Sequence, residues 1–183
     1  MPSPSEPTDE VLATAAATGD KVAFTALLER HYERLFAFAW RHTGSRHEAE
    51  DLTQDICVAL PEKLRRYDGR AQLVTWLYRV AVNAAHDRRR RQAAHRRAAL
   101  GWGESELARQ DENDDRLAAS DWLARAMRAL PDELRDTVAL TLGEGLPQVQ
   151  VAEILGISPG TIAWRMSEVK RRLREWAEME EGR

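Results

Sequence analysis

The chain has 183 residues, 43% of them hydrophobic, which allows one domain of ordinary size or two small ones with modest cores. The net charge of −3, one cysteine (Cys57) and no apolar run of bilayer length exclude an internal disulfide, a CxxC metal site and a membrane-inserted protein. We therefore expect a cytoplasmic protein of two small helical domains.

Residues 1–20 are predicted to form a flexible N-terminal tail. Their opening, MPSPSEPTDE, is acidic and rich in proline and serine. It lacks the basic start and apolar run of a signal peptide, so we expect no export of the chain.

Residues 21–97 are predicted to form a first helical domain, because apolar side chains recur there at steps of three and four. A Gly-Ser pair at 44–45 marks a break between its first two helices. Pro61 is expected to kink or split the second helix. An Asp-Gly pair at 68–69 predicts a turn, after which a third helix runs on into a cluster of arginines.

Charge is segregated along the chain. The stretch 85–97 holds six arginines and one acid, whereas residues 104–121 hold seven acids and two arginines. Because salt screens charges beyond about 10 Å, a local basic patch can bind phosphate despite the negative total. Residues 98–120, rich in acids and poor in apolar side chains, are predicted to be an acidic linker.

Residues 121–175 are predicted to form a second helical domain that ends in a helix-turn-helix, followed by an acidic tail at 176–183. Gly156 is expected to make the tight turn, with Ser158 as N-cap and Pro159 as the first helical residue. The outer side of this last helix is where a recognition helix faces the major groove. Trp164 lies on that side, and two roles stay open for it: covering a neighbouring helix or contacting DNA.

Four segments, in this order, carry a resemblance to a known family: EAEDLTQDICVAL, TWLYRVAVNAAHDRRRR, ALPDELRDTVAL and GLPQVQVAEILGISPGTIAWRMSEVKRRL. Together they resemble the extracytoplasmic-function (ECF) sigma factors over residues 24–91 and 122–174. The resemblance implies an all-α protein of two small helical domains joined by an acidic flexible linker. It also implies core RNA polymerase, promoter DNA and an anti-sigma factor as partners, a monomer when free, no enzymatic activity and no cofactor.

The resemblance further implies three sets of contact residues. The DLTQD helix is expected to dock on the clamp of the largest catalytic polymerase subunit through Asp51, Gln54 and Asp55. The residues expected to capture and help melt the promoter minus-ten element are Tyr67, Trp76, Arg79, Asn83, His86, Arg88, Arg89 and Arg90. The residues expected to bind the minus-thirty-five element are Ser158, Thr161, Trp164, Arg165, Glu168, Lys170, Arg171 and Arg172.

The sequence departs from the family's commonest pattern in its last helix. Ala163, Trp164 and Glu168 stand where basic and small hydroxyl residues are usual. We therefore expect an unusual upstream promoter preference, with Glu168 able to accept a hydrogen bond from a cytosine amine.

Bland alternatives exist for several of these features. The DLTQD face is also compatible with an ordinary solvated helix surface, and Tyr67 and Trp76 with core packing. The acidic linker is expected either to imitate nucleic acid in the polymerase cleft or to act as a spacer. For the whole chain the alternative is a conventional helix-turn-helix regulator, whereas the five histidines show no metal spacing and favour no enzyme.

Overall fold

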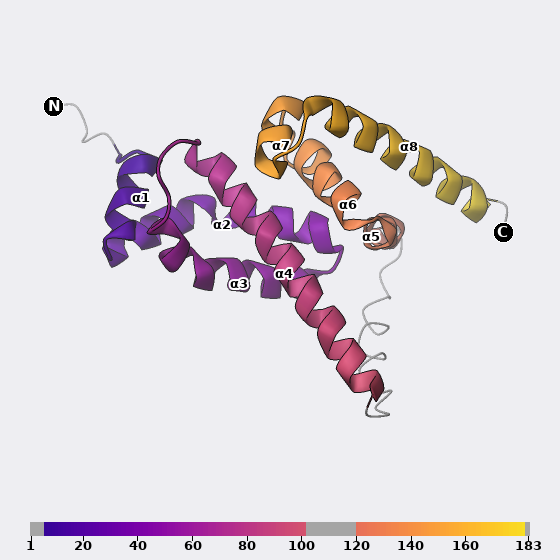
Figure 1. Ribbon diagram of the computed structural model, residues 1–183, viewed down its shortest axis with the longest axis horizontal. Coiled ribbons are helices and arrows are strands. Elements are labelled where there is room, and N and C mark those ends of the chain that lie inside the picture. Colours follow the sequence, from indigo (N-terminus) through magenta and orange to yellow (C-terminus); the bar gives the residue numbers. More distant parts are fainter. Residues whose placement is uncertain (1–5, 102–119, 182–183) are drawn as a thin grey trace.

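The computed structural model describes residues 6–101 and 120–181, and all regular structure in these two ranges is helical (Figure 1). The N-terminal domain consists of α1 (Asp9–Ala17), α2 (Lys21–Thr43), α3 (Arg46–Leu64) and α4 (Leu73–Gly101). The C-terminal domain consists of α5 (Ser120–Ala129), α6 (Asp132–Val138), the π-helical turn η1 (Ala139–Gly143), α7 (Gln148–Leu155) and α8 (Pro159–Glu181). The predicted all-α fold with two helical domains is thus confirmed. None of the helices in the described ranges has the length and apolarity that crossing a membrane requires.

The prediction of a flexible tail over residues 1–20 is wrong for residues 9–17, which form α1. The Thr8 side chain caps this helix by accepting a hydrogen bond from the Val11 amide at 3.4 Å. One face of α1 is buried against the domain core through Leu12, Ala13 and Ala16. The Asp9 carboxylate holds α1 to α2 through His31 Nε2 at 2.8 Å. Enough apolar surface is buried to order a segment whose composition suggested a tail.

The break between α2 and α3 lies where the Gly-Ser pair predicted it. Gly44 ends α2 in the left-handed conformation, with φ of 68°, and Ser45 caps α3. A Cβ on Gly44 would also lie 2.8 Å from the carbonyl oxygen of Ala124 in α5, so the lack of a side chain permits close approach of the C-terminal domain. Pro61 does not split α3, because a proline removes only its own amide and the buried Leu64 anchors the last turn on the core.

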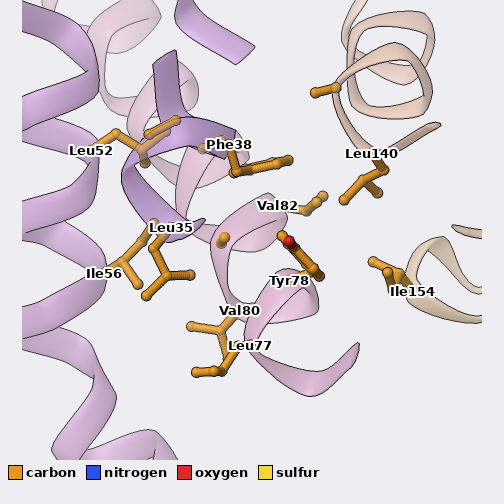
Figure 2. Packing of buried hydrophobic residues seen from close by; sticks show 14 of the residues in the cluster. Leu35, Phe38, Leu52, Ile56, Leu77, Tyr78, Val80, Val82, Leu140 and Ile154 are labelled. Carbon is orange, nitrogen blue, oxygen red and sulfur yellow. The ribbon is translucent and has the colours of Figure 1, made fainter. Parts of the chain in front are cut away.

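The helix α4 lies between the two domains (Figure 1). The predicted Asp-Gly turn precedes it, with the Arg70 amide donating to Asp68 Oδ1 at 3.1 Å. Figure 2 shows Tyr78 of α4 on the side of Leu140 and Ile154 of the C-terminal domain, while Leu35 and Ile56 of the N-terminal domain lie on its other side. All of these residues belong to one continuous buried cluster. The two domains therefore share a core through α4.

The C-terminal domain contains the predicted helix-turn-helix. Gly156 adopts the left-handed conformation, with φ of 66°, and the Ile157 amide returns to the Ala152 carbonyl at 3.0 Å. Ser158 caps α8 by accepting from the Thr161 amide at 3.1 Å, and α8 begins at Pro159 as predicted. Of the predicted linker 98–120, residues 98–101 continue α4, where helix-favouring Ala98 follows the basic run, and Ser120 begins α5. The stretch 102–119, with the DENDD run, lies outside the described residues.

Candidate nucleic-acid interface

Three of the α4 residues predicted to bind the minus-ten element contact the C-terminal domain. Arg79 donates to the backbone carbonyl oxygens of Glu153 at 2.8 Å and Ile154 at 3.4 Å. His86 Nε2 lies 2.7 Å from Asp136 Oδ2, and Arg89 forms an ion pair with Asp132. The interdomain contact therefore occupies the polar groups that DNA would use.

The centre of this contact is the carboxylate of Asp136 in α6, whose side chain is 3% exposed. It lies between two histidines of the other domain, 2.8 Å from His42 Nε2 of α2 and 2.7 Å from His86 Nε2 of α4. Burial opposes ionisation of Asp136, but the hydrogen bonds from the two histidines outweigh it and lower its pKa. The same hydrogen bond raises the pKa of His86, whereas burial lowers the pKa of His42. The cluster thus combines an ionised aspartate with a readily protonated His86.

A second carboxylate, Glu144, joins the domains beside η1. It accepts from Arg41 Nη1 at 2.5 Å and from the Tyr78 hydroxyl at 2.6 Å. Burial, followed by the bond to Glu144, raises the pKa of Tyr78, which keeps this hydroxyl protonated and donating. Both partners of Glu144 lie in the N-terminal domain, so this carboxylate also stabilises the closed arrangement.

The remaining predicted minus-ten residues fall into two groups. Asn83 is exposed on α4, and Arg90 is exposed and paired with Asp87 at 2.5 Å. Tyr67 and Trp76 are partly buried with ring centroids 5.2 Å apart, and the Tyr67 hydroxyl donates to the Ala71 carbonyl at 2.7 Å. The structure thus packs the two aromatic rings against each other and leaves the amide of Asn83 open to solvent.

The predicted polymerase-binding face of α3 meets arginines of α4. The Asp51 carboxylate accepts from Arg88 at 2.6 Å, and the Asp55 carboxylate accepts from Arg91 at 2.8 Å and from Arg88 at 3.4 Å. Gln54 is exposed on the same helix. Both acids of this face therefore have cationic partners within the chain, which places Arg88 at α3 as well as on the basic helix.

The outer face of α8 carries both exposed and internally paired side chains. Trp164 is 62% exposed, which argues against the packing role that the sequence left open for it. Glu168 accepts from Arg171 at 2.6 Å and from Arg172 at 2.7 Å, and these hydrogen bonds lower the pKa of Glu168 to about 2. Glu168 is therefore ionised and held by its own helix.

Other members of the predicted minus-thirty-five set have local roles as well. The hydroxyl groups of Ser158 and Thr161 lie 2.9 Å apart in the N-cap of α8. Arg165 donates to the Glu133 carbonyl at 3.3 Å, which links α8 to α6, and Lys170 is exposed. The available charge for DNA phosphates on this face is thus on Lys170 and the arginines beside it.

The sequence reasoning did not identify His42, Tyr78, Asp136 and Glu144 as functional residues. The one available signal was an ionisable residue at an inward helical position: Asp136 follows the buried Leu134 and precedes the buried Val138. A carboxylate is almost never fully buried unless it is paired, so its position called for a partner. Its partners are 50 and 94 residues away in the chain and could not be read from local spacing.

Comparison with known proteins supports the same division of the chain. The family models "Sigma-70 region 2" and "Sigma-70, region 4" match residues 27–95 and 120–173. The chain is 32% identical over 182 residues to the ECF RNA polymerase sigma factor SigE of Mycolicibacterium smegmatis, a match that covers 93% of this chain and 70% of the relative. The chain belongs to the ECF RNA polymerase sigma factors. The family expected from the four sequence segments is therefore confirmed.

Further matches are consistent with an ECF sigma factor. The ECF RNA polymerase sigma factor SigM of Mycobacterium tuberculosis is 30% identical over 168 residues, covering 92% of this chain and 84% of the relative. A structure of CnrH in complex with the cytosolic domain of CnrY has a TM-score of 0.65 at 25% identity and covers 93% of this chain and 97% of that one. The sigma factor RpoE in complex with the anti-sigma factor NepR from Bartonella quintana, at 23% identity and TM-score 0.62, has the same fold.

Proposed function

We propose that this ECF sigma factor guides core RNA polymerase to promoters and that the present structure is a closed form in which its two domains block each other's DNA contacts. The observation that carries the proposal is the occupation of Arg79, His86 and Arg89 by the C-terminal domain. Hydrogen-bond donors already satisfied in a protein interface cannot contact phosphates or bases until that interface opens. Promoter binding then requires separation of the domains.

Within this proposal, α4 binds the minus-ten element and α8 the minus-thirty-five element. Asn83 and Arg90 are accessible on α4 in the closed form, and opening frees Arg79, His86 and Arg89. Gln54 is the exposed member of the polymerase-binding face. Support comes from the matching family models and from the basic run on α4, which suits a phosphate backbone.

We further propose that an anti-sigma factor holds the closed form. Support comes from an apolar cavity of about 620 Å³ at the seam, to which α2 contributes Phe36 and Trp40, and to which α5 and η1 contribute Leu123 and Leu142. A partner that fills this cavity contacts both domains at once and favours their docked arrangement. The similar structures named above include a sigma factor bound to an anti-sigma factor.

The central experiment is reconstitution with core RNA polymerase. The purified chain should co-elute with core polymerase and support promoter-specific initiation. A chain that binds DNA sequence-specifically without associating with polymerase would instead be a conventional helix-turn-helix regulator.

Two variants test the assigned faces separately. Gln54→Ala should weaken binding to core polymerase, whereas Gln148→Ala, an exposed glutamine of α7, should not. Gln54 is a cleaner probe than Asp51, since replacing Asp51 also releases Arg88 from an ion pair. Equal pull-down by both glutamine variants would remove the assignment of this face.

Asn83→Ala tests the minus-ten assignment. It should impair opening of duplex promoters and leave holoenzyme assembly unchanged, because it removes an exposed amide directed at bases. Permanganate footprinting on duplex and premelted templates separates the two steps. Equal impairment on both templates would mean that Asn83 does not act in melting.

A further inference from the structure

A second cavity, of about 380 Å³, lies at the seam between the domains and is polar where the first is apolar. It is bounded by the end of α2, the start of α3, the middle of α4 and the helices α5 and α6. Its charged and titratable lining residues are His42, His47, Glu48, Arg88, Arg89, Arg96, Arg128 and Arg135. Five arginines therefore face one carboxylate across an enclosed volume.

The positive charge of this cavity is compensated incompletely. Arg135 donates to the carbonyl oxygens of Met127 at 2.7 Å and Leu130 at 2.8 Å, which satisfy its donors without neutralising its charge. Burial lowers the pKa of Arg135 to about 10, and the nearby charge of Arg89 lowers it further. An arginine loses basicity in this way only where positive charge is crowded and partly desolvated.

The start of α3 adds further donors. Ser45 caps this helix of 19 residues, and both Ser45 and His47 line the cavity. A helix N-terminus carries a partial positive charge and attracts anions. The Nε atom of Arg88 is buried and has no hydrogen-bond partner within the described residues. The cavity thus joins a helix N-terminus, several guanidinium groups and one unused buried donor.

We propose that this cavity binds a small phosphate-bearing anion with more than one charge, such as a pyrophosphate group, and that the bound anion stabilises the closed form. Guanidinium groups bind phosphate oxygens in pairs, and the volume admits a diphosphate and excludes a DNA duplex. Because Arg88, Arg89 and Arg96 come from one domain and Arg128 and Arg135 from the other, the site is complete only when the domains are docked. By linkage, a ligand of the complete site must favour docking.

This inference goes beyond the proposed function, since neither Arg96 nor Arg128 belongs to the polymerase or promoter contacts assigned above. Inorganic pyrophosphate is the probe, with calorimetric titration of the full chain at fixed ionic strength and sulfate as the reference anion. We expect pyrophosphate to bind at least tenfold more tightly than sulfate and to reduce the radius of gyration measured by X-ray scattering. Arg96→Ala combined with Arg128→Ala should reduce pyrophosphate affinity at least tenfold.

Arg97→Ala is the matched control. Arg97 is the exposed neighbour of Arg96 on α4, does not line the cavity and donates to the Ala93 carbonyl. It should bind pyrophosphate like the parent chain, and circular dichroism should show all variants equally helical. Equal loss in the Arg96 and Arg97 variants, or equal affinity for pyrophosphate and sulfate, would overturn the proposal.

Duplex DNA distinguishes the two sources of phosphate. If the arginines form a backbone site for DNA, a duplex without promoter sequence will need Arg96 and Arg128 for binding and pyrophosphate will not compete, which also overturns the proposal. The free-anion site predicts competition-independent duplex binding by the double variant. Initiation assays without pyrophosphate report on the promoter assignment by itself, so either conclusion can fail without the other.

Discussion

Asp136→Asn should open the two domains while leaving each of them folded. The substitution preserves the volume of a side chain that is 3% exposed and removes the charge shared by His42 and His86. One amide oxygen remains to accept from one histidine, and the amide NH₂ replaces the other acceptor. The contact is therefore weakened at its centre without creating a cavity.

The size of the effect follows from the two hydrogen bonds. A hydrogen bond to a charged group contributes about 1.5–3 kcal/mol, and one of the two is lost or becomes neutral. His86 is partly exposed, so solvent screening reduces its share. We expect the closed form to lose about 2 kcal/mol relative to the open form, which is roughly a 30-fold shift in their ratio.

Solution X-ray scattering and histidine NMR measure this shift. The variant should have a larger radius of gyration than the parent, and the pKa of His86 should fall back toward its ordinary value. Asp87→Asn is the control, because Asp87 is exposed next to His86 and pairs with Arg90 of its own helix. Unchanged scattering and an unchanged His86 titration in Asp136→Asn would refute the reasoning that this carboxylate holds the domains together.

Three further predictions follow from other parts of the molecule. Leu12→Ala should cost about 2–4 kcal/mol in urea unfolding, because Leu12 of α1 is 5% exposed, while the exposed Val11→Ala should cost less than about 0.5 kcal/mol. The raised pKa of His86 means that its contribution to docking is fully present below pH 6.5 and is lost as pH rises through its higher folded value, so the difference in radius of gyration between the parent and His86→Gln should shrink at alkaline pH. Trp164→Ala should keep its melting temperature and lose selectivity in a randomised upstream-element selection; a large loss of stability would return Trp164 to a packing role. In the same selection, Glu168→Arg should change the preference at one base pair by about 1–3 kcal/mol, whereas Lys170→Ala should weaken all promoters alike; an unchanged preferred sequence would exclude Glu168 as a base reader.

The helices of both domains could be predicted because their determinants are local. The apolar periodicity of α2, the capping of α8 by Ser158 and the turn at Gly156 are each set within a few residues. The helix α1 was missed because the proline and serine content of residues 1–7 outweighed a capped helix that starts only two residues later. Its stability depends on burial against α2, which composition does not report.

Domain docking could not be predicted from the sequence. The contacts of Arg41 with Glu144 and of His42 with Asp136 join residues 103 and 94 positions apart, and no periodicity records such pairs. The minus-ten set was chosen from residue type and from the family resemblance, both of which describe a helix that faces DNA. The structure shows the same helix facing another domain, so one set of polar groups fits two competing partners.

Gly44 meets two demands that are separable. The end of α2 needs a residue that tolerates the left-handed conformation, which asparagine also does, whereas the approach of Ala124 tolerates no Cβ at all. A Gly44→Asn substitution would keep the helix end and act as a wedge at the seam. In genetic terms, a mutation at this one position would yield a constitutive allele, a dominant sigma factor that escapes its own self-restraint while every DNA-binding side chain stays as it was.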